Sequence, residues 1–97
     1  MFEIQLTDHA REQLAGLKAD KGLFKRYKAV VKTIRFLSED PRHHGLSTHE
    51  FTTLKGPKGE KVFEAYAEQR TPAPYLVFWY YGPGEDHITL FAITPHP

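Results

Sequence analysis

The side chains available for chemistry in this chain are those of lysine, arginine, histidine, glutamate and aspartate. The 97 residues include 13 Lys and Arg, 12 Asp and Glu, six His and no cysteine. The absence of cysteine excludes disulfides, thiolate zinc sites, iron–sulfur clusters and cysteine nucleophiles. Histidine and glutamate suit proton transfer, whereas lysine and arginine suit a phosphate or a developing negative charge. Cleavage of RNA without a metal ion needs a base, an acid and a cation, and these residue types can supply all three.

Positive charge is concentrated in one segment of the chain. Between Lys18 and Arg35 lie seven basic residues and one acid, Asp20, so the segment has a net charge of +6, against +1 for the whole chain. No Lys or Arg occurs in residues 71–97. Such a cluster can attract a polyanion or an acidic peptide, and the alternative interpretation is a solvated helix face.

The histidines do not predict a metal site, and no cofactor is expected. The spacings among His43, His44, His49 and His87 impose no coordination geometry, and the His-Glu-x-x-His motif is absent. No apolar run approaches the roughly 18 residues that span a bilayer. The N-terminus lacks the pattern of a signal peptide. We therefore expect a cytoplasmic protein that does not bind a membrane.

The elements that must position these side chains begin with a strand and two helices. Residues 2–6 alternate between apolar and polar types, and Thr7 or Asp8 can cap a helix over residues 8–19. A second helix is predicted over residues 23–39. Its apolar residues fall in one arc of about 140°, and its basic residues fall in an adjoining arc of about 100°.

The second half of the chain predicts strands. Residues 42–59 are rich in loop signals, with a short extended piece around residues 50–54. Strands are predicted over residues 62–68, 75–81 and 88–94, separated by short turns that favour antiparallel pairing. The expected fold is α+β, in the order β-α-α-β-β-β, with two helices on one face of a small antiparallel-rich sheet. Residues 1–97 are expected to form a single domain.

Short motifs in this order carry a resemblance to a known family. They are Phe2, Leu6-Thr7, Ala10, Leu14, Leu54-Lys55-Gly56-Pro57, and residues 62–66, 75–79 and 88–97. The chain resembles the RelE/ParE superfamily of bacterial toxin–antitoxin systems over nearly its whole length. The resemblance implies a small cytoplasmic toxin that a cognate antitoxin protein wraps and neutralises. RelE-like members cleave mRNA on the ribosome, and ParE-like members inhibit DNA gyrase.

The resemblance also implies a catalytic site of basic and proton-transferring residues. Lys55 matches a basic residue before the second strand, Glu50 lies near a position that is acidic in some members, and His96 matches a His or Tyr near the C-terminus. The candidates for catalysis are then Glu50 or His49 as base, Lys55 and Arg70 on phosphate, and His96 as acid, with the acid and base roles left open.

The basic helix face is the expected place for binding RNA. Phosphate neutralisation by Lys and Arg gives affinity without sequence preference, which would suit docking to ribosomal RNA. The candidate RNA-binding residues are Lys25, Lys28, Lys32 and Arg35.

Each catalytic candidate also has an ordinary structural interpretation. His49 and Glu50 could be loop surface, Lys55 could belong to a turn, and His96 could lie in a frayed terminus. Arg70 alternates with Glu64 and Glu68, so a regular strand would place the three on one face as an ion-pair ladder. Two glutamates on that face would repel RNA, which counts against a nuclease.

One departure from the family pattern bears on activity. Members commonly carry Arg at the head of the central strand, where it contacts the scissile phosphate, but here the segment reads Tyr75-Leu76-Val77. Leucine cannot pair with a phosphate. Three functions are therefore open: a ribosome-dependent mRNA endoribonuclease weakened by Leu76 or using Arg70 instead, a gyrase inhibitor, and an inactive member that only binds an antitoxin. The sequence does not indicate an oligomeric state.

Overall fold

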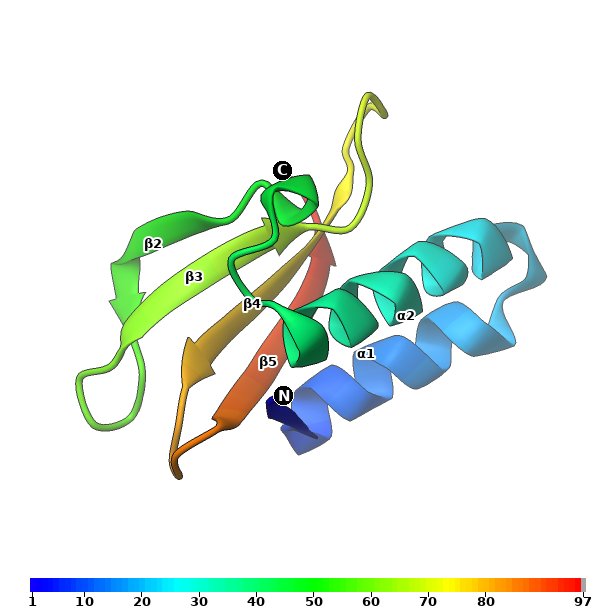
Figure 1. Cartoon of the computed structure of the whole chain (residues 1–97). Coiled ribbons are helices and arrows are strands. Elements are labelled where there is room, and N and C mark those ends of the chain that lie inside the picture. Colours follow the sequence, from blue (N-terminus) through cyan, green and yellow to red (C-terminus); the bar gives the residue numbers. More distant parts are fainter. Residues whose placement is uncertain (97) are drawn as a thin grey trace.

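The chain forms one five-stranded sheet with two helices packed on one of its faces (Figure 1). This computed structural model describes residues 1–96, so Pro97, the end of the predicted domain, lies outside the described residues. The predicted α+β class is confirmed. The elements are β1 (Glu3–Leu6), α1 (Asp8–Ala19), η1 (Lys21–Leu23), α2 (Phe24–Glu39), η2 (His44–Leu46), β2 (His49–Lys55), β3 (Lys61–Tyr66), β4 (Tyr75–Tyr81) and β5 (His87–Pro95).

The strands lie in the order β1-β5-β4-β3-β2. The short connections between β2, β3, β4 and β5 join antiparallel neighbours. Strand β1 pairs in parallel with β5, at the opposite edge of the sheet from β2. The sheet is therefore antiparallel-rich, as predicted, with one parallel pair.

The extended piece expected near residues 50–54 is a full edge strand, β2, which makes the order β-α-α-β-β-β-β. Its register with β3 shifts between Glu50 and Lys55. Six of its seven residues are exposed. An edge strand with so little burial has no strong alternation of apolar and polar residues, and so the sequence pattern indicates only part of it.

The core lies between the sheet and the helices. Alternate residues of β4, Val77 and Trp79, point to the helices together with Ile88 and Leu90 of β5, and all four are buried. On the helix side the buried residues are Ala10, Leu17, Val30, Thr33 and Leu37. The face of β4 that the helices do not cover carries Leu76, Phe78 and Tyr80. We call this side of the sheet the open face.

Two side chains of the N-terminal segment fasten α1 to the sheet. The Thr7 hydroxyl accepts a hydrogen bond from the Ala10 amide (3.2 Å) and caps the helix, as the sequence predicts. The Gln13 side-chain oxygen accepts a hydrogen bond from the Ile93 amide (2.7 Å). Strand β1 pairs with β5 only as far as Leu90, so Gln13 satisfies a backbone donor that β1 does not reach.

Candidate functional site

Three aromatic rings lie side by side at one end of the open face. His49 begins β2, Tyr66 ends β3, and His96 follows β5. The His49 and Tyr66 rings meet edge to face with centroids 6.1 Å apart, and the centroids of the Tyr66 and His96 rings are 6.3 Å apart. We call these three residues the His–Tyr–His cluster.

Strand register explains why residues so far apart in sequence meet here. His49 lies opposite Glu64, and Tyr66 lies opposite Leu76, which in turn lies opposite Thr94. Residues opposite one another in a sheet point to the same face, and residues two apart on one strand do so as well. The cluster therefore depends on the antiparallel pairing of four strands.

In the cluster, the phenol ring of Tyr66 lies between the imidazole rings of His49 and His96. Neutral imidazole accepts a proton and imidazolium donates one near neutral pH, so a pair of histidines can supply a base and an acid. His49 is exposed and His96 is also exposed, which leaves both rings accessible to a polymer substrate. The backbone amide of His96 donates to the Pro74 carbonyl (2.8 Å), which holds the residue against the β3–β4 loop.

Glu50 does not join the cluster. It lies opposite Phe63, whose ring stacks on Trp79 with centroids 4.9 Å apart on the helix side of the sheet. Adjacent strand residues point to opposite faces, so Glu50 faces away from His49. Of the two bases that the sequence left open, only His49 lies on the same face of the sheet as Tyr66, whose ring also neighbours His96.

Lys55 lies at the other end of the open face. It lines a cavity of about 290 Å³ with Thr7, Tyr80 and Phe91. Phe91 and His96 are five residues apart, which corresponds to about 17 Å along an extended strand. The structure therefore does not bring Lys55 together with the His–Tyr–His cluster.

Arg70 lies in the β3–β4 loop, which projects beyond the end of the sheet (Figure 1). Its backbone is left-handed, with φ 59°. The ladder expected with Glu64 and Glu68 does not form, because β3 ends at Tyr66. Glu68 turns instead toward α2, where it lies 3.9 Å from Arg26 and accepts a hydrogen bond from the Tyr75 amide (3.0 Å). This arrangement removes one of the two acids that would have repelled RNA from the open face.

Leu76 points to the open face but is only 2% exposed. Its cross-strand neighbours are Tyr66 of the cluster and Thr94 of β5. The position at which the sequence departs from the expected family pattern is thus a packed apolar site.

The four candidate RNA-binding residues share one exposed surface of α2. Lys25, Lys28, Lys32 and Arg35 line a shallow cavity of about 500 Å³. Val31, which is 41% exposed, lies in the same lining. We call these four residues the α2 basic face. Lys32 of this face also lines a smaller cavity, of about 130 Å³, together with Tyr66 of the His–Tyr–His cluster.

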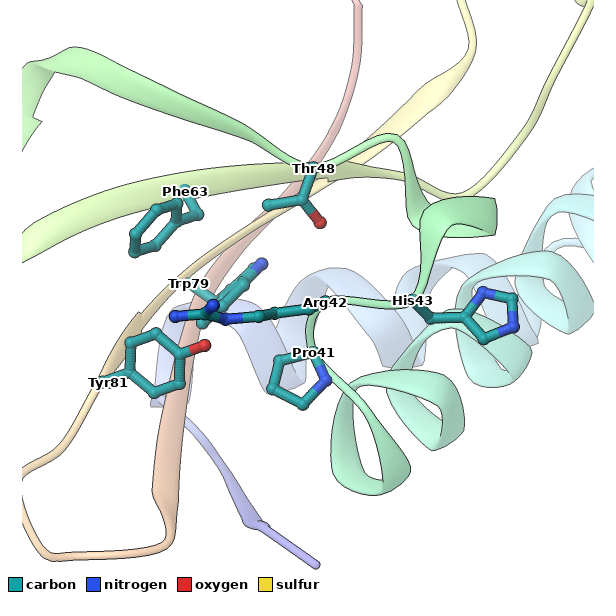
Figure 2. Close-up of a pocket in the computed structure, with 7 residues that line it drawn as sticks. All are labelled: Pro41, Arg42, His43, Thr48, Phe63, Trp79 and Tyr81. Atoms are coloured by element: carbon teal, nitrogen blue, oxygen red, sulfur yellow. The ribbon is translucent and has the colours of Figure 1, made fainter.

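A further cavity, of about 310 Å³, lies where the segment after α2 meets β2, β3 and β4 (Figure 2). Trp79 and Thr48 line it, and neither the Trp79 Nε1 atom nor the Thr48 Oγ1 atom has a hydrogen-bond partner among the described residues. The sequence pattern predicts no site here. No spacing could reveal it, because its lining comes from four separate segments.

Other kinds of site are not formed by the described part of the chain. Among residues 1–96, no group of three or more His, Asp or Glu side chains is placed to hold a metal ion. Within the same residues, no helix is both long enough and apolar enough to cross a membrane.

Comparison with solved structures identifies the architecture. The archaeal RelE of the RelE–RelB complex from Pyrococcus horikoshii OT3 superimposes with a TM-score of 0.66, covering 97% of this chain and 93% of that chain. The chain has a RelE-like fold. Sequence identity across the match is 14%. No family model matches the sequence, and no curated protein matches it.

The RelE-like fold extends over both helices and all five strands, since the match covers nearly the whole chain. It confirms the resemblance at the level of architecture. At 14% identity the side chains differ at most positions, so the chemistry has to be argued from the residues of this chain.

Proposed function

We propose that this protein is the toxin of a type II toxin–antitoxin system and that it cleaves mRNA on the ribosome. The observation that carries the proposal is the His–Tyr–His cluster, which lies on the open face of a RelE-like fold. Two accessible histidines can perform both proton transfers of RNA cleavage without a metal ion. The action on ribosomes would place the protein in the cytoplasm.

In the proposed reaction one histidine of the cluster removes the proton from a ribose 2′-hydroxyl. The resulting oxygen attacks the adjacent phosphorus, and the bond to the 5′-oxygen breaks. The other histidine protonates that 5′-oxygen, and the product keeps a 2′,3′-cyclic phosphate. Tyr66, between the two rings, is positioned to stack on a base or to donate a hydrogen bond to the phosphate.

A cation is needed to stabilise the negative charge that develops on the phosphate. Arg70 is the better placed of the two basic candidates, because its loop is fastened beside His96 by the bond between the His96 amide and the Pro74 carbonyl. Lys55 would instead bind RNA further along the open face, where Tyr80 and Phe91 offer rings for base stacking.

The α2 basic face is proposed to bind ribosomal RNA. It lies on α2, whereas the cluster lies on the sheet, and Lys32 and Tyr66 line one small cavity where the two surfaces approach each other. A ribosome offers phosphate backbone on several sides of a bound protein, and contacts of this kind need no base sequence.

The proposed partner is an antitoxin. The related structure is a complex of RelE with RelB. In this chain, β2 is an edge strand whose outer side is unpaired in the sheet, and the α2 basic face would attract an acidic segment. Strand addition and charge pairing are both common ways of binding a peptide.

The test is mRNA cleavage in a translating extract. We expect His49→Ala and His96→Ala each to reduce the cleavage rate by about 100-fold or more, the usual contribution of general acid–base catalysis. His9→Ala, a matched change at an exposed position of α1, should leave the rate unchanged. Absence of cleavage by the parent protein would contradict the proposal.

One observation favours a second candidate, a member that binds an antitoxin without cleaving RNA. Leu76 is buried where the resemblance leads one to expect a phosphate-binding arginine, so position 76 gives the cluster no cation. Antitoxin binding with no cleavage and no growth arrest would support this candidate. Growth arrest without cleavage, together with loss of supercoiling activity, would indicate gyrase as the target.

A further inference from the structure

The cavity shown in Figure 2 is built from polar groups that have no partner and from flat aromatic walls. Trp79 is 1% exposed, yet its Nε1 atom has no hydrogen-bond partner among the described residues. Leaving a buried donor unpaired is costly, so such a group favours an acceptor from outside the chain. The Thr48 hydroxyl is unpaired in the same way and points into the same space (Figure 2).

The cavity is also positively charged. Arg42 extends from the segment after α2 toward Trp79 and Tyr81, whereas the neighbouring His43 ring points away (Figure 2). No acidic residue belongs to the lining. Glu50 lies opposite Phe63 on the neighbouring strand, but it is not part of the lining. The polar groups that face the cavity are thus the guanidinium of Arg42, the indole N–H of Trp79 and the hydroxyls of Thr48 and Tyr81. All four can donate hydrogen bonds, and one is positively charged, so they suit an anion.

The walls of the cavity are aromatic. Phe63 stacks on Trp79, with ring centroids 4.9 Å apart. Tyr81 meets the Trp79 ring edge to face at a centroid distance of 5.0 Å. The volume of about 310 Å³ equals about ten molecules of liquid water, so the cavity is larger than one bridging water requires. It lies at the lower end of the range for small-molecule sites.

We infer that this cavity binds a small aromatic carboxylate. The carboxylate would accept hydrogen bonds from Arg42, Trp79 and Thr48, and the aromatic body of the ligand would pack against the wall that Phe63 and Tyr81 form, whose ring centroids are 5.9 Å apart. The inference does not rest on the proposed function, because the cavity is on the helix side of the sheet and the His–Tyr–His cluster is on the open face.

The experiment uses the single tryptophan of the chain. Because Trp79 is the only tryptophan, the ¹⁵N-labelled protein gives one indole N–H signal, and that signal belongs to the cavity. The protein is titrated with benzoate, with benzyl alcohol, which has the ring without the charge, and with acetate, which has the charge without the ring. Benzoate is expected to move the indole signal along a saturable curve, and the other two probes to bind at least about tenfold more weakly.

Arg42→Gln tests the charge. Its side chain is exposed, so the fold should tolerate the change, and benzoate binding is expected to weaken by about tenfold or more. Arg11→Gln, an arginine on the exposed side of α1, is the matched control and should bind benzoate as the parent does. Absence of a saturable benzoate shift, an equal response to benzyl alcohol, or unchanged binding in Arg42→Gln would each overturn the inference.

Discussion

At the scale of single residues, Leu76 replaces a charged group expected on the open face with a packed apolar one. The side chain is 2% exposed on the open face, beside Tyr66 of the His–Tyr–His cluster. A leucine at this position stabilises the sheet by apolar packing and gives the cluster no cation. Catalytic capacity at the open face would then depend on Arg70 from the adjoining loop.

Replacing Leu76 with arginine is expected to destabilise the protein. The change removes a buried apolar side chain and forces a charged group into the same space, so the free energy of unfolding should fall by about 2–4 kcal/mol. Denaturant unfolding of Leu76→Arg measures this, with Leu76→Met as the control that conserves volume and should cost less than about 1.5 kcal/mol. Equal stability of Leu76→Arg and the parent would show that the position tolerates an exposed cation.

At the scale of elements, a hydrogen bond to the Gln13 side chain adds to the core packing of α1 on β5. The Gln13 oxygen accepts from the Ile93 amide (2.7 Å) where β1 no longer pairs with β5. This contact connects the second turn of the helix to the strand that leads to His96. It explains how a four-residue strand, β1, is sufficient to fix one edge of the sheet.

Gln13→Ala is expected to lower the free energy of unfolding by about 1–3 kcal/mol, because the Ile93 amide loses its acceptor in a partly buried setting. Hydrogen exchange should become faster at Ile93 before it does so at core amides such as Val77. Gln13→Glu keeps an oxygen acceptor and serves as the control. If Gln13→Ala unfolds at the same denaturant concentration as the parent, the contact contributes nothing to stability.

On the scale of the whole molecule, three surfaces with different chemistry face different directions. The His–Tyr–His cluster occupies the open face, the α2 basic face lies on the outer side of a helix, and the Figure 2 cavity opens between the sheet and the segment after α2. The first two surfaces approach each other at Lys32 and Tyr66, which line one small cavity. The outer residues of the α2 basic face can be changed without altering the cluster.

The double variant Lys28→Gln/Lys32→Gln is expected to weaken ribosome binding and to reduce the slope of log affinity against log salt by about 2, since each lysine that contacts a phosphate contributes about 1. Binding measured at several salt concentrations gives the slope. Lys58→Gln/Lys61→Gln makes the same charge change near the β2–β3 turn and should leave the slope unaltered. An equal loss in both double variants would mean that only net charge matters.

The sequence by itself determined the local elements and the fold class. Helical spacing and the cap set the bounds of α1, a continuous apolar run set those of β4, and the apolar and basic arcs of α2 predicted its two faces. These features depend on residues close together in the chain, where spacing and geometry are directly linked. Periodicity gave less information on β2, because an exposed edge strand has little need to alternate.

Only the tertiary structure decided which candidate residues meet. Strand register brought His49 to Tyr66 and His96, turned Glu50 to the other face and left Lys55 at the far end of the sheet. The end of β3 at Tyr66 directed Glu68 to Arg26. Register changes which face every side chain takes, and it is set by pairing between distant segments. For the same reason the cavity around Trp79 could not be read from the spacing of its residues.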